Sequence, residues 1–289
     1  MRDRILTLIL TVISREIFRR DRRNGKMKRI LDAFSFAEQR LVLESGGRRL
    51  SAVYVSAGTD APAVLICHGI GEVVEYWGRV QEAFREMGVS SLVFNYSGYG
   101  ASSGTITAAH CEEDVIAAYR ALIDRGHRSI VLLGFSLGTG ISCAAASRID
   151  LDGLILCEGF STFREAAMSI GCPQWLTRTV PDVWNTAVRV CDLSVPVLVV
   201  HSDADELFPM TMAKRIAEAC GQRGELIVVN GLVHDAPIYT ATPVYWQPIA
   251  DWVKRRSAEV GREESTVARS QSAVSGSSGD VESLPAPSS

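Results

Sequence analysis

The stretch IVLLGFSLGTG, residues 130–140, decides the fold of this chain. Its first residues are apolar and end on a glycine, as in a strand that is buried on both faces. Gly134-Phe135-Ser136-Leu137-Gly138 follows, and a helical pattern occupies residues 140–148. A G-x-S-x-G sequence between a strand and a helix is typical of a strained turn that exposes its serine at the helix N-terminus. We therefore expect Ser136 to be a nucleophile.

Short apolar runs before and after this turn predict the rest of a sheet. Residues 38–44 and 50–55 have the pattern of a leading antiparallel hairpin. Six further strands, apolar on both faces, are expected at residues 63–67, 91–96, 130–134, 153–157, 195–200 and 226–229. Helical patterns alternate with these strands. The chain is therefore predicted to be an α/β protein with a doubly wound, mostly parallel, eight-stranded sheet.

Three segments depart from this alternation. Residues 161–193 contain helical fragments and no strand pattern, which predicts a small helical cap inserted over the sheet. Residues 257–289 are rich in Ser, Gly, Pro and charge, so we expect a disordered tail. Residues 1–35 form a basic leader with an apolar stretch. One α/β domain should therefore span residues 36–256.

A serine hydroxyl is a weak nucleophile at neutral pH and needs a base that a third group orients. His234 follows the last predicted strand, and Asp205 follows the strand before it. Sheets of this kind carry their functional residues beyond the carboxyl ends of the strands. We expect Ser136, Asp205 and His234 to form a catalytic triad in the chain order Ser, Asp, His.

Other residues compete for these roles. Asp203 and Glu206 flank Asp205, Glu158 follows the strand at residues 153–157, and Asp235 is the weakest claimant. The remaining histidines are expected in other roles, His110 and His127 at helix ends, His201 packed at a strand end, and His68 in a loop. That leaves His234 as the base, with Asp203 or Glu158 as alternatives to Asp205.

The loop His68-Gly69-Ile70-Gly71 follows the strand at residues 63–67. Backbone N–H groups aimed at one point can stabilise the oxyanion that forms during acyl transfer. We expect the N–H groups of Leu137 and Ile70 to form this oxyanion hole, with Gly71 as the alternative to Ile70.

Charge and cysteine usage limit the partners of the chain. The formal net charge of −3 and the pI near 6.0 argue against binding of nucleic acid, which needs a broad basic surface. The seven cysteines show no C-x-x-C pair and no metal-ligand spacing. We expect free thiols in a reducing, cytoplasmic compartment and no metal site.

The leader has a charge of its own. Residues 1–30 carry ten basic and three acidic side chains, a net charge of +7, so the remainder carries −10. The apolar stretch at residues 5–13 is far shorter than the ~20 residues of a membrane-spanning helix. A helix on a membrane surface is expected, with a helix docked on the body or a misassigned start codon as alternatives.

Together, these motifs resemble the α/β-hydrolase superfamily over roughly residues 38–256. The HG turn at residues 68–69, YSGYGASSG at residues 96–104, the Ser136 turn, Asp205 and His234 carry the resemblance. They look most like the branch of serine-aminopeptidase-like hydrolases and protein depalmitoylases. Ile70 and Val233 depart from residues frequent in those relatives.

The resemblance implies a serine hydrolase that acts on esters, thioesters or amides through an acyl-enzyme, without metal or cofactor. Its partner would be a small-molecule acyl substrate, with a possible peripheral membrane contact through the leader. In the cap, Trp175, Leu176, Trp184 and Met168 could line an apolar acyl pocket or pack the cap onto the core. An acyltransferase using the same serine and a non-catalytic binding protein of the same fold are the alternatives.

Overall fold

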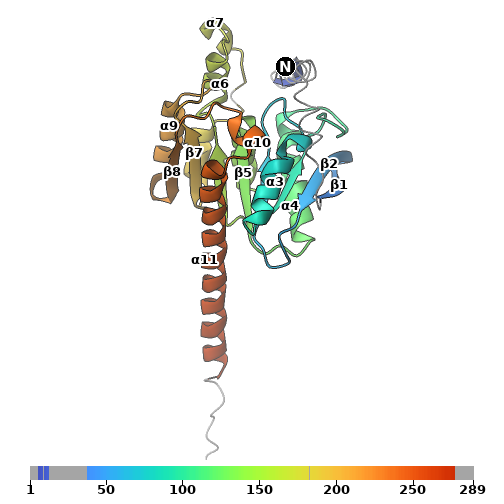
Figure 1. The fold of residues 1–289 in the computed structure, drawn as a ribbon, viewed down its shortest axis with the longest axis vertical. Helices are drawn as coiled ribbons and strands as arrows, with labels where there is room; N and C mark the ends of the chain where they lie inside the picture. Colours follow the sequence, from blue (N-terminus) through green and yellow to red (C-terminus); the bar gives the residue numbers. More distant parts are fainter. Residues whose placement is uncertain (1–5, 9, 13–37, 182, 277–289) are drawn as a thin grey trace, which may run out of the picture.

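The architecture is a single eight-stranded sheet between two layers of helices, seen in a computed structural model that describes residues 6–8, 10–12, 38–181 and 183–276 (Figure 1). The strands are β1 Glu38–Ser45, β2 Arg48–Val55, β3 Ala63–Cys67, β4 Ser90–Phe94, β5 Ile130–Phe135, β6 Gly153–Cys157, β7 Val197–Ser202 and β8 Gly224–Val229. Their order in the sheet is β1-β2-β4-β3-β5-β6-β7-β8. Strands β1, β2 and β4 pair antiparallel, and all later neighbours are parallel. The predicted fold is confirmed.

Helices cover the sheet on both faces because its central strands are apolar on both faces. The helices are η1 Val74–Trp77, α3 Gly78–Glu86, α4 Ala108–Ile123, α5 Leu137–Ala146, α6 Phe163–Ser169, α7 Gln174–Thr177, α8 Thr186–Arg189, η2 Val190–Asp192, α9 Met210–Cys220, η3 Gly221–Arg223, α10 Ala236–Thr240 and α11 Pro243–Gly276. Buried side chains of α4, α5 and α9 belong to one core cluster, and those of α3, α10 and α11 to the other. The strands that carry the candidate site therefore lie between two cores.

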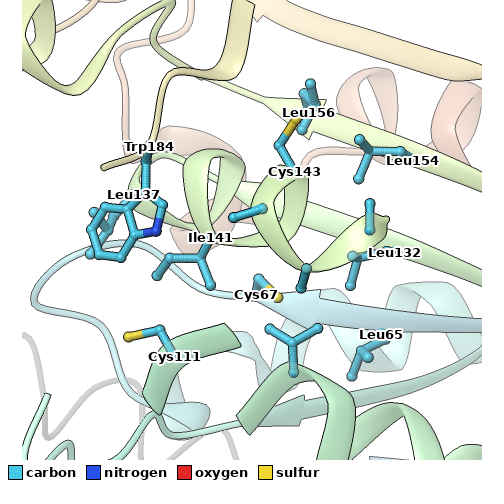
Figure 2. Close-up of a cluster of buried hydrophobic side chains, with 14 of the residues drawn as sticks. Leu65, Cys67, Cys111, Leu132, Leu137, Ile141, Cys143, Leu154, Leu156 and Trp184 are labelled. Carbon is cyan, nitrogen blue, oxygen red and sulfur yellow. The ribbon is translucent and has the colours of Figure 1, made fainter. Parts of the chain in front are cut away.

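The first of these cores contains Trp184, for which the sequence left open a place in an acyl pocket or a place between the cap and the core. Figure 2 shows Trp184 beside Leu137 and Ile141, on the inner side of α5. Its side chain is fully buried, and a Cβ at Gly140 would lie 2.5 Å from the Cβ of Trp184. The indole thus fills the space that a glycine leaves open on α5. Trp184 belongs to the core and not to a cap surface.

One predicted segment boundary differs from the described structure. Residues 257–276 continue α11, within the segment for which the composition predicts a disordered tail, and residues 277–289 lie outside the described residues. Arg256 and Glu259, one turn apart, form an ion pair on this helix. In Figure 1, α11 projects far from the body.

The described part of the leader is helical and packs on the body. Leu6 and Leu10, one helical turn apart, are fully buried in the core cluster of α4 and α5, and the Thr7 hydroxyl donates a hydrogen bond of 2.9 Å to the carbonyl of Ile106. Of the two placements weighed for the leader, docking on the body holds for these residues. No helix among the described residues is long and apolar enough to cross a membrane.

Candidate active site

The turn between β5 and α5 holds Ser136 in a strained conformation. Its φ of 52° lies in the left-handed region, which residues other than glycine rarely adopt. The flanking glycines are required by close packing, because a Cβ at Gly138 would lie 1.9 Å from the carbonyl oxygen of Cys67, and one at Gly134 would lie 2.3 Å from Ser142 Oγ. The serine thus stands at the N-terminus of α5, held from both sides.

His234 reaches this serine from the loop after β8. Its Nε2 lies 2.9 Å from Ser136 Oγ, and its Nδ1 lies 2.8 Å from Asp205 Oδ2. The imidazole is buried, between the rings of Phe135 and Phe208. With Nδ1–H donating to the carboxylate, Nε2 is left to accept the serine proton. The three residues predicted to form a triad are therefore in hydrogen-bond contact.

Asp205 is fixed by more than the histidine. Its Oδ1 accepts hydrogen bonds from the backbone N–H groups of Leu207, at 2.7 Å, and Phe208, at 2.9 Å. Burial alone would raise the pKa of the Asp205 carboxyl, but the hydrogen bond and charge of His234, together with the Phe208 amide, lower it below its usual value. The carboxylate is thus held ionised beside the imidazole.

The competing acids take structural roles in the same loops. Asp203 Oδ1 accepts a hydrogen bond of 2.7 Å from the Gly231 N–H, and Glu206 Oε2 accepts one of 2.8 Å from the backbone N–H of His234. Asp235 occupies the N-cap position of the short helix α10, without a cap hydrogen bond from its side chain. Asp203 and Glu206 thus bind backbone N–H groups of the histidine loop, whereas the imidazole nitrogens of His234 contact Asp205 and Ser136.

Glu158 is the exception, because it lies next to the triad acid. It follows β6, has a φ of 45°, and its side chain is fully buried. Its carboxyl oxygens accept hydrogen bonds from the Ser202 N–H, at 3.0 Å, and the Tyr245 hydroxyl, at 2.9 Å. Burial and the hydrogen-bonded neighbour Asp205 raise the pKa of Glu158 well above its usual value.

The loop predicted to contribute to an oxyanion hole follows β3 and packs directly on Ser136. A Cβ at Gly69 would lie 3.1 Å from Ser136 Cβ. The buried Glu72 holds this loop, because it accepts hydrogen bonds of 2.9 Å from the Gly69 N–H and from Trp77 Nε1. Ile70 and Leu137 both line the cavity at Ser136. Leu137 is the first residue of α5, so no carbonyl of the helix is available to accept a hydrogen bond from its backbone N–H.

The other four histidines form hydrogen bonds with residues other than Ser136. Burial lowers the pKa of His68 to about 4, and its Nδ1–H donates to the Gly69 carbonyl at 2.8 Å. His201 is packed at the end of β7 and donates through Nε2 to the Phe208 carbonyl at 2.9 Å. His127 is buried against Tyr54 and not solvated, and His110 bonds the Thr105 carbonyl.

An apolar cavity of about 590 Å³ opens at Ser136. Its wall combines Ile70 and Leu137 with apolar side chains of the leader, the segment after β6, the cap and the β7–α9 loop: Leu8, Leu10, Val12, Phe160, Phe163, Ala166, Ala167, Ile170, Cys172, Leu176, Val180, Leu207 and Phe208. None of the described residues that line it carries a charged side chain. The cavity is therefore suited to an apolar group.

Only one of the cap residues predicted to bind substrate lies in this wall. Leu176 lines the cavity, whereas Trp175 points outward with 75% of its surface exposed and Trp184 is buried in the core. Successive residues of a helix point about 100° apart, so Leu176 of α7 can line the cavity while its neighbour Trp175 faces solvent. Met168 is also exposed and lies outside the wall. Trp184 supports the cavity from behind, in edge-to-face contact with Phe163.

Sequence reasoning missed several residues of the site. The leader residues Leu8, Leu10 and Val12 line the cavity although some 120 residues separate them from Ser136. Glu72 and Tyr245 support the oxyanion loop and Glu158. The place of Glu72 three residues after Gly69 is only a weak indication of its role in the sequence. Nothing in the sequence indicates that the leader contacts the cavity.

One group of described residues could offer ligand atoms to a metal ion. A carboxylate oxygen of Glu158, one of Asp205 and a nitrogen of His234 lie within 4.8 Å of one another. Both nitrogens of His234 are already engaged, one by Asp205 and one by Ser136. An ion here would have to break the contact between the imidazole and one of these partners. The hydrogen bonds of His234 therefore compete with metal binding by this group.

Comparison with known proteins agrees with this fold. Residues 62–180 match the family model for the alpha/beta hydrolase fold. An uncharacterized protein of Mycobacterium tuberculosis is 28% identical over 198 residues, which cover 66% of this chain and 70% of that protein. Human alpha/beta hydrolase domain-containing protein 17B is 26% identical over 210 residues, which cover 68% of each chain.

Among solved structures, an esterase of Pyrococcus furiosus superposes with a TM-score of 0.63 at 18% identity, covering 79% of this chain and 94% of the esterase. A proline iminopeptidase of Mycobacterium smegmatis gives a TM-score of 0.63 at 15% identity, covering 77% of this chain and all of the peptidase. Because one neighbour is named for ester cleavage and the other for peptide cleavage, the shared fold does not select the bond. The chain has the α/β-hydrolase fold and is similar to proteins of that superfamily, which at this coarse level supports a hydrolase.

Proposed function

We propose that this protein is a serine hydrolase that cleaves esters or thioesters of apolar acyl groups through an acyl-enzyme. The observation that carries the proposal is the chain of contacts from Asp205 through His234 to Ser136 Oγ, at 2.8 and 2.9 Å, which ends at the mouth of an apolar cavity. A strained nucleophile turn and an adjacent glycine loop support the same chemistry.

The reaction follows from these positions. His234 Nε2 accepts the proton of Ser136 as Oγ attacks the acyl carbonyl, and Asp205 stabilises the imidazolium that forms. The N–H groups of Leu137 and Ile70 are the donors for the oxyanion. Collapse of the tetrahedral intermediate breaks the bond to the alcohol or thiol, which takes the proton from His234. Water, activated by the same imidazole, then releases the acid and restores Ser136.

The cavity favours an apolar acyl group over an aminoacyl group. An α-ammonium group needs a carboxylate nearby, because an unpaired buried charge is costly. None of the described residues that line the cavity is acidic, and aliphatic or aromatic side chains dominate its wall. We therefore place the acyl chain between the cap and the leader, with the leaving group toward solvent.

Fluorophosphonate labelling tests the nucleophile. The wild type should be labelled at Ser136, and Ser136→Ala should not be. Ser56→Ala is the matched control, because Ser56 is exposed and follows the end of β2 that pairs with the amino-terminal end of β4, away from the site. Labelling of Ser136→Ala at the wild-type level, or a folded wild type that takes no label, would refute the proposal.

A chain-length series tests the acyl site. With nitrophenyl esters from acetyl to palmitoyl, kcat/KM should rise by up to about fourfold per methylene until the cavity is filled, since burying one CH₂ contributes ~0.8 kcal/mol. Matched thioesters and aminoacyl amides decide the bond type. A flat series, or faster cleavage of aminoacyl amides, would contradict the assignment of the cavity as an acyl site.

A further inference from the structure

The mouth of the acyl cavity is surrounded by exposed apolar side chains. Leu8 and Val12 of the leader, and Ile170 and Leu176 of the cap, line the cavity and are exposed at the same time, so they form its rim. Two further exposed apolar side chains of the cap are close to these in the chain, Trp175 next to Leu176 and Met168 two residues before Ile170. These six residues are half of the exposed large apolar side chains of the described chain. We call them the rim.

The rim combines two segments that the fold brings to the same end of the molecule. Figure 1 shows α7 and the N-terminal helix projecting at one end, while α11 leaves toward the other. The leader helix is apolar on two faces: Leu6 and Leu10 are buried in the core, and Leu8 and Val12 point outward. A helix that only needed to dock would present polar residues on its outer face. Its outward leucine and valine need another apolar surface.

The charge of the two chain segments that contribute to the rim, counted from the sequence, identifies that surface. The first 30 residues carry a net charge of +7 on a chain whose remainder carries −10. The cap adds the exposed Arg164 and Arg178, and its Glu165 is already paired with Arg215. A protein partner could match an apolar patch alone, but apolar side chains beside concentrated positive charge are the pattern that anionic bilayers bind.

We infer that the rim is a lipid-docking surface that seats the mouth of the acyl cavity on an anionic membrane. Leu8, Val12 and Trp175 enter the interfacial region, and the basic leader pairs with anionic headgroups. This inference rests on the proposed function in one respect: if the cavity binds an acyl chain, docking lets that chain pass from the bilayer into the cavity without crossing water. Docking itself requires no catalysis.

Trp175 makes the docking directly observable. The structure describes all five tryptophans of the chain; Trp77, Trp184, Trp246 and Trp252 are buried, and Trp175 is exposed. A change of tryptophan emission on docking therefore reports residue 175. Full-length Ser136→Ala protein is mixed with phosphatidylcholine vesicles containing 30% phosphatidylserine, so that turnover plays no part. We expect co-sedimentation, a blue shift, and quenching by brominated lipid acyl chains.

Variants separate the rim from non-specific attraction. Trp175→Phe should bind the vesicles without the blue shift, and Trp175→Ser should bind about tenfold or more weakly, because a large apolar side chain contributes about 1.5–3 kcal/mol when it is buried. Val42→Ser, at an exposed apolar position on β1, should bind as the parent does. Far-ultraviolet circular dichroism and Tm verify that each variant is folded.

Three outcomes would overturn the inference. The protein could fail to sediment with anionic vesicles; it could bind, yet show no shift at Trp175 and lose all binding in high salt, which would mean that charge alone attracts it. It could also form a dimer without lipid that Trp175→Ser dissociates, which would assign the rim to a second copy. Hydrolysis of a soluble acetyl ester by the wild type, measured separately, reports the proposed function; its absence leaves the vesicle result standing.

Discussion

Glu158 and Asp205 are two carboxylic acids that follow neighbouring parallel strands, β6 and β7, and have opposite ionisation. Asp205 is bonded to His234 and to two backbone N–H groups, and its pKa is lowered. Glu158 is fully buried, has no cation bonded to it, and its pKa is raised because burial and the Asp205 charge oppose its ionisation. The difference shows that partners, and not the position at a strand end, decide which acid serves the histidine.

The largest expected effect comes from neutralising Asp205, the ionised acid of the pair. Asp205→Asn removes the carboxylate that fixes the tautomer of His234, and we expect kcat to fall by about 10⁴-fold, the loss typical of this change in a serine triad. Steady-state hydrolysis of a soluble ester and the rate of fluorophosphonate labelling measure it.

Asp203→Asn is the matched control for this loss. Asp203 lies two residues away and bonds only the Gly231 N–H, so its variant should stay within about tenfold of the wild type. If Asp203→Asn costs as much as Asp205→Asn, or if Glu158→Gln costs more than either, the roles of the acids are assigned wrongly.

The sequence was informative where a residue acts through its place in the fold. Apolar runs predicted all eight strands, and the positions of Ser136, Asp205 and His234 after β5, β7 and β8 placed them at one edge of the sheet. The order of strands converts positions in the chain into proximity, so three distant residues could be brought together without coordinates.

Side-chain environment was beyond the same reasoning. Glu158 could be named as a rival acid, but its raised pKa depends on the removal of water around it and on its contact with Asp205, which lies on a different loop. Trp175 and Trp184 are equally apolar in the sequence, and only the packing of short cap helices separates an exposed indole from a core indole. The inward and outward leucines of the leader, Leu6 and Leu8, could not be separated for the same reason.

A second prediction concerns the pH dependence of stability, in which the two acids act in opposite directions. The lowered pKa of Asp205 contributes stability that is lost as the pH falls below its unfolded value of 3.8. Above pH 4.5, the ordinary pKa of the group, Glu158 loses its proton in the unfolded state but keeps it in the folded state, where its pKa is raised. The folded state therefore loses stability relative to the unfolded state as the pH rises. Glu158→Gln removes that release, because the amide imitates the protonated acid.

Between pH 5 and 8, the stability of Glu158→Gln relative to the wild type should therefore increase, by at most about 1.4 kcal/mol per pH unit. Urea unfolding at several pH values measures the difference. The exposed Glu44→Gln on β1 serves as control and should show no such trend. A difference between Glu158→Gln and the wild type that does not change with pH would mean that Glu158 is ionised in the folded protein.

The smallest effect is expected from Tyr245→Phe, which sharpens the comparison by changing only one partner of Glu158. The buried Tyr245 hydroxyl donates to Glu158 Oε1 and so lowers the pKa of Glu158 against the larger effect of burial. Its loss should cost about 1 kcal/mol of stability, the usual contribution of one hydrogen bond. In Tyr245→Phe the pKa of Glu158 rises further, so the loss of stability with rising pH should extend to higher pH than in the wild type. The double variant Tyr245→Phe, Glu158→Gln should lack this extension. The same unfolding series measures both variants, and an extension that persists in the double variant would show that another group titrates in this region.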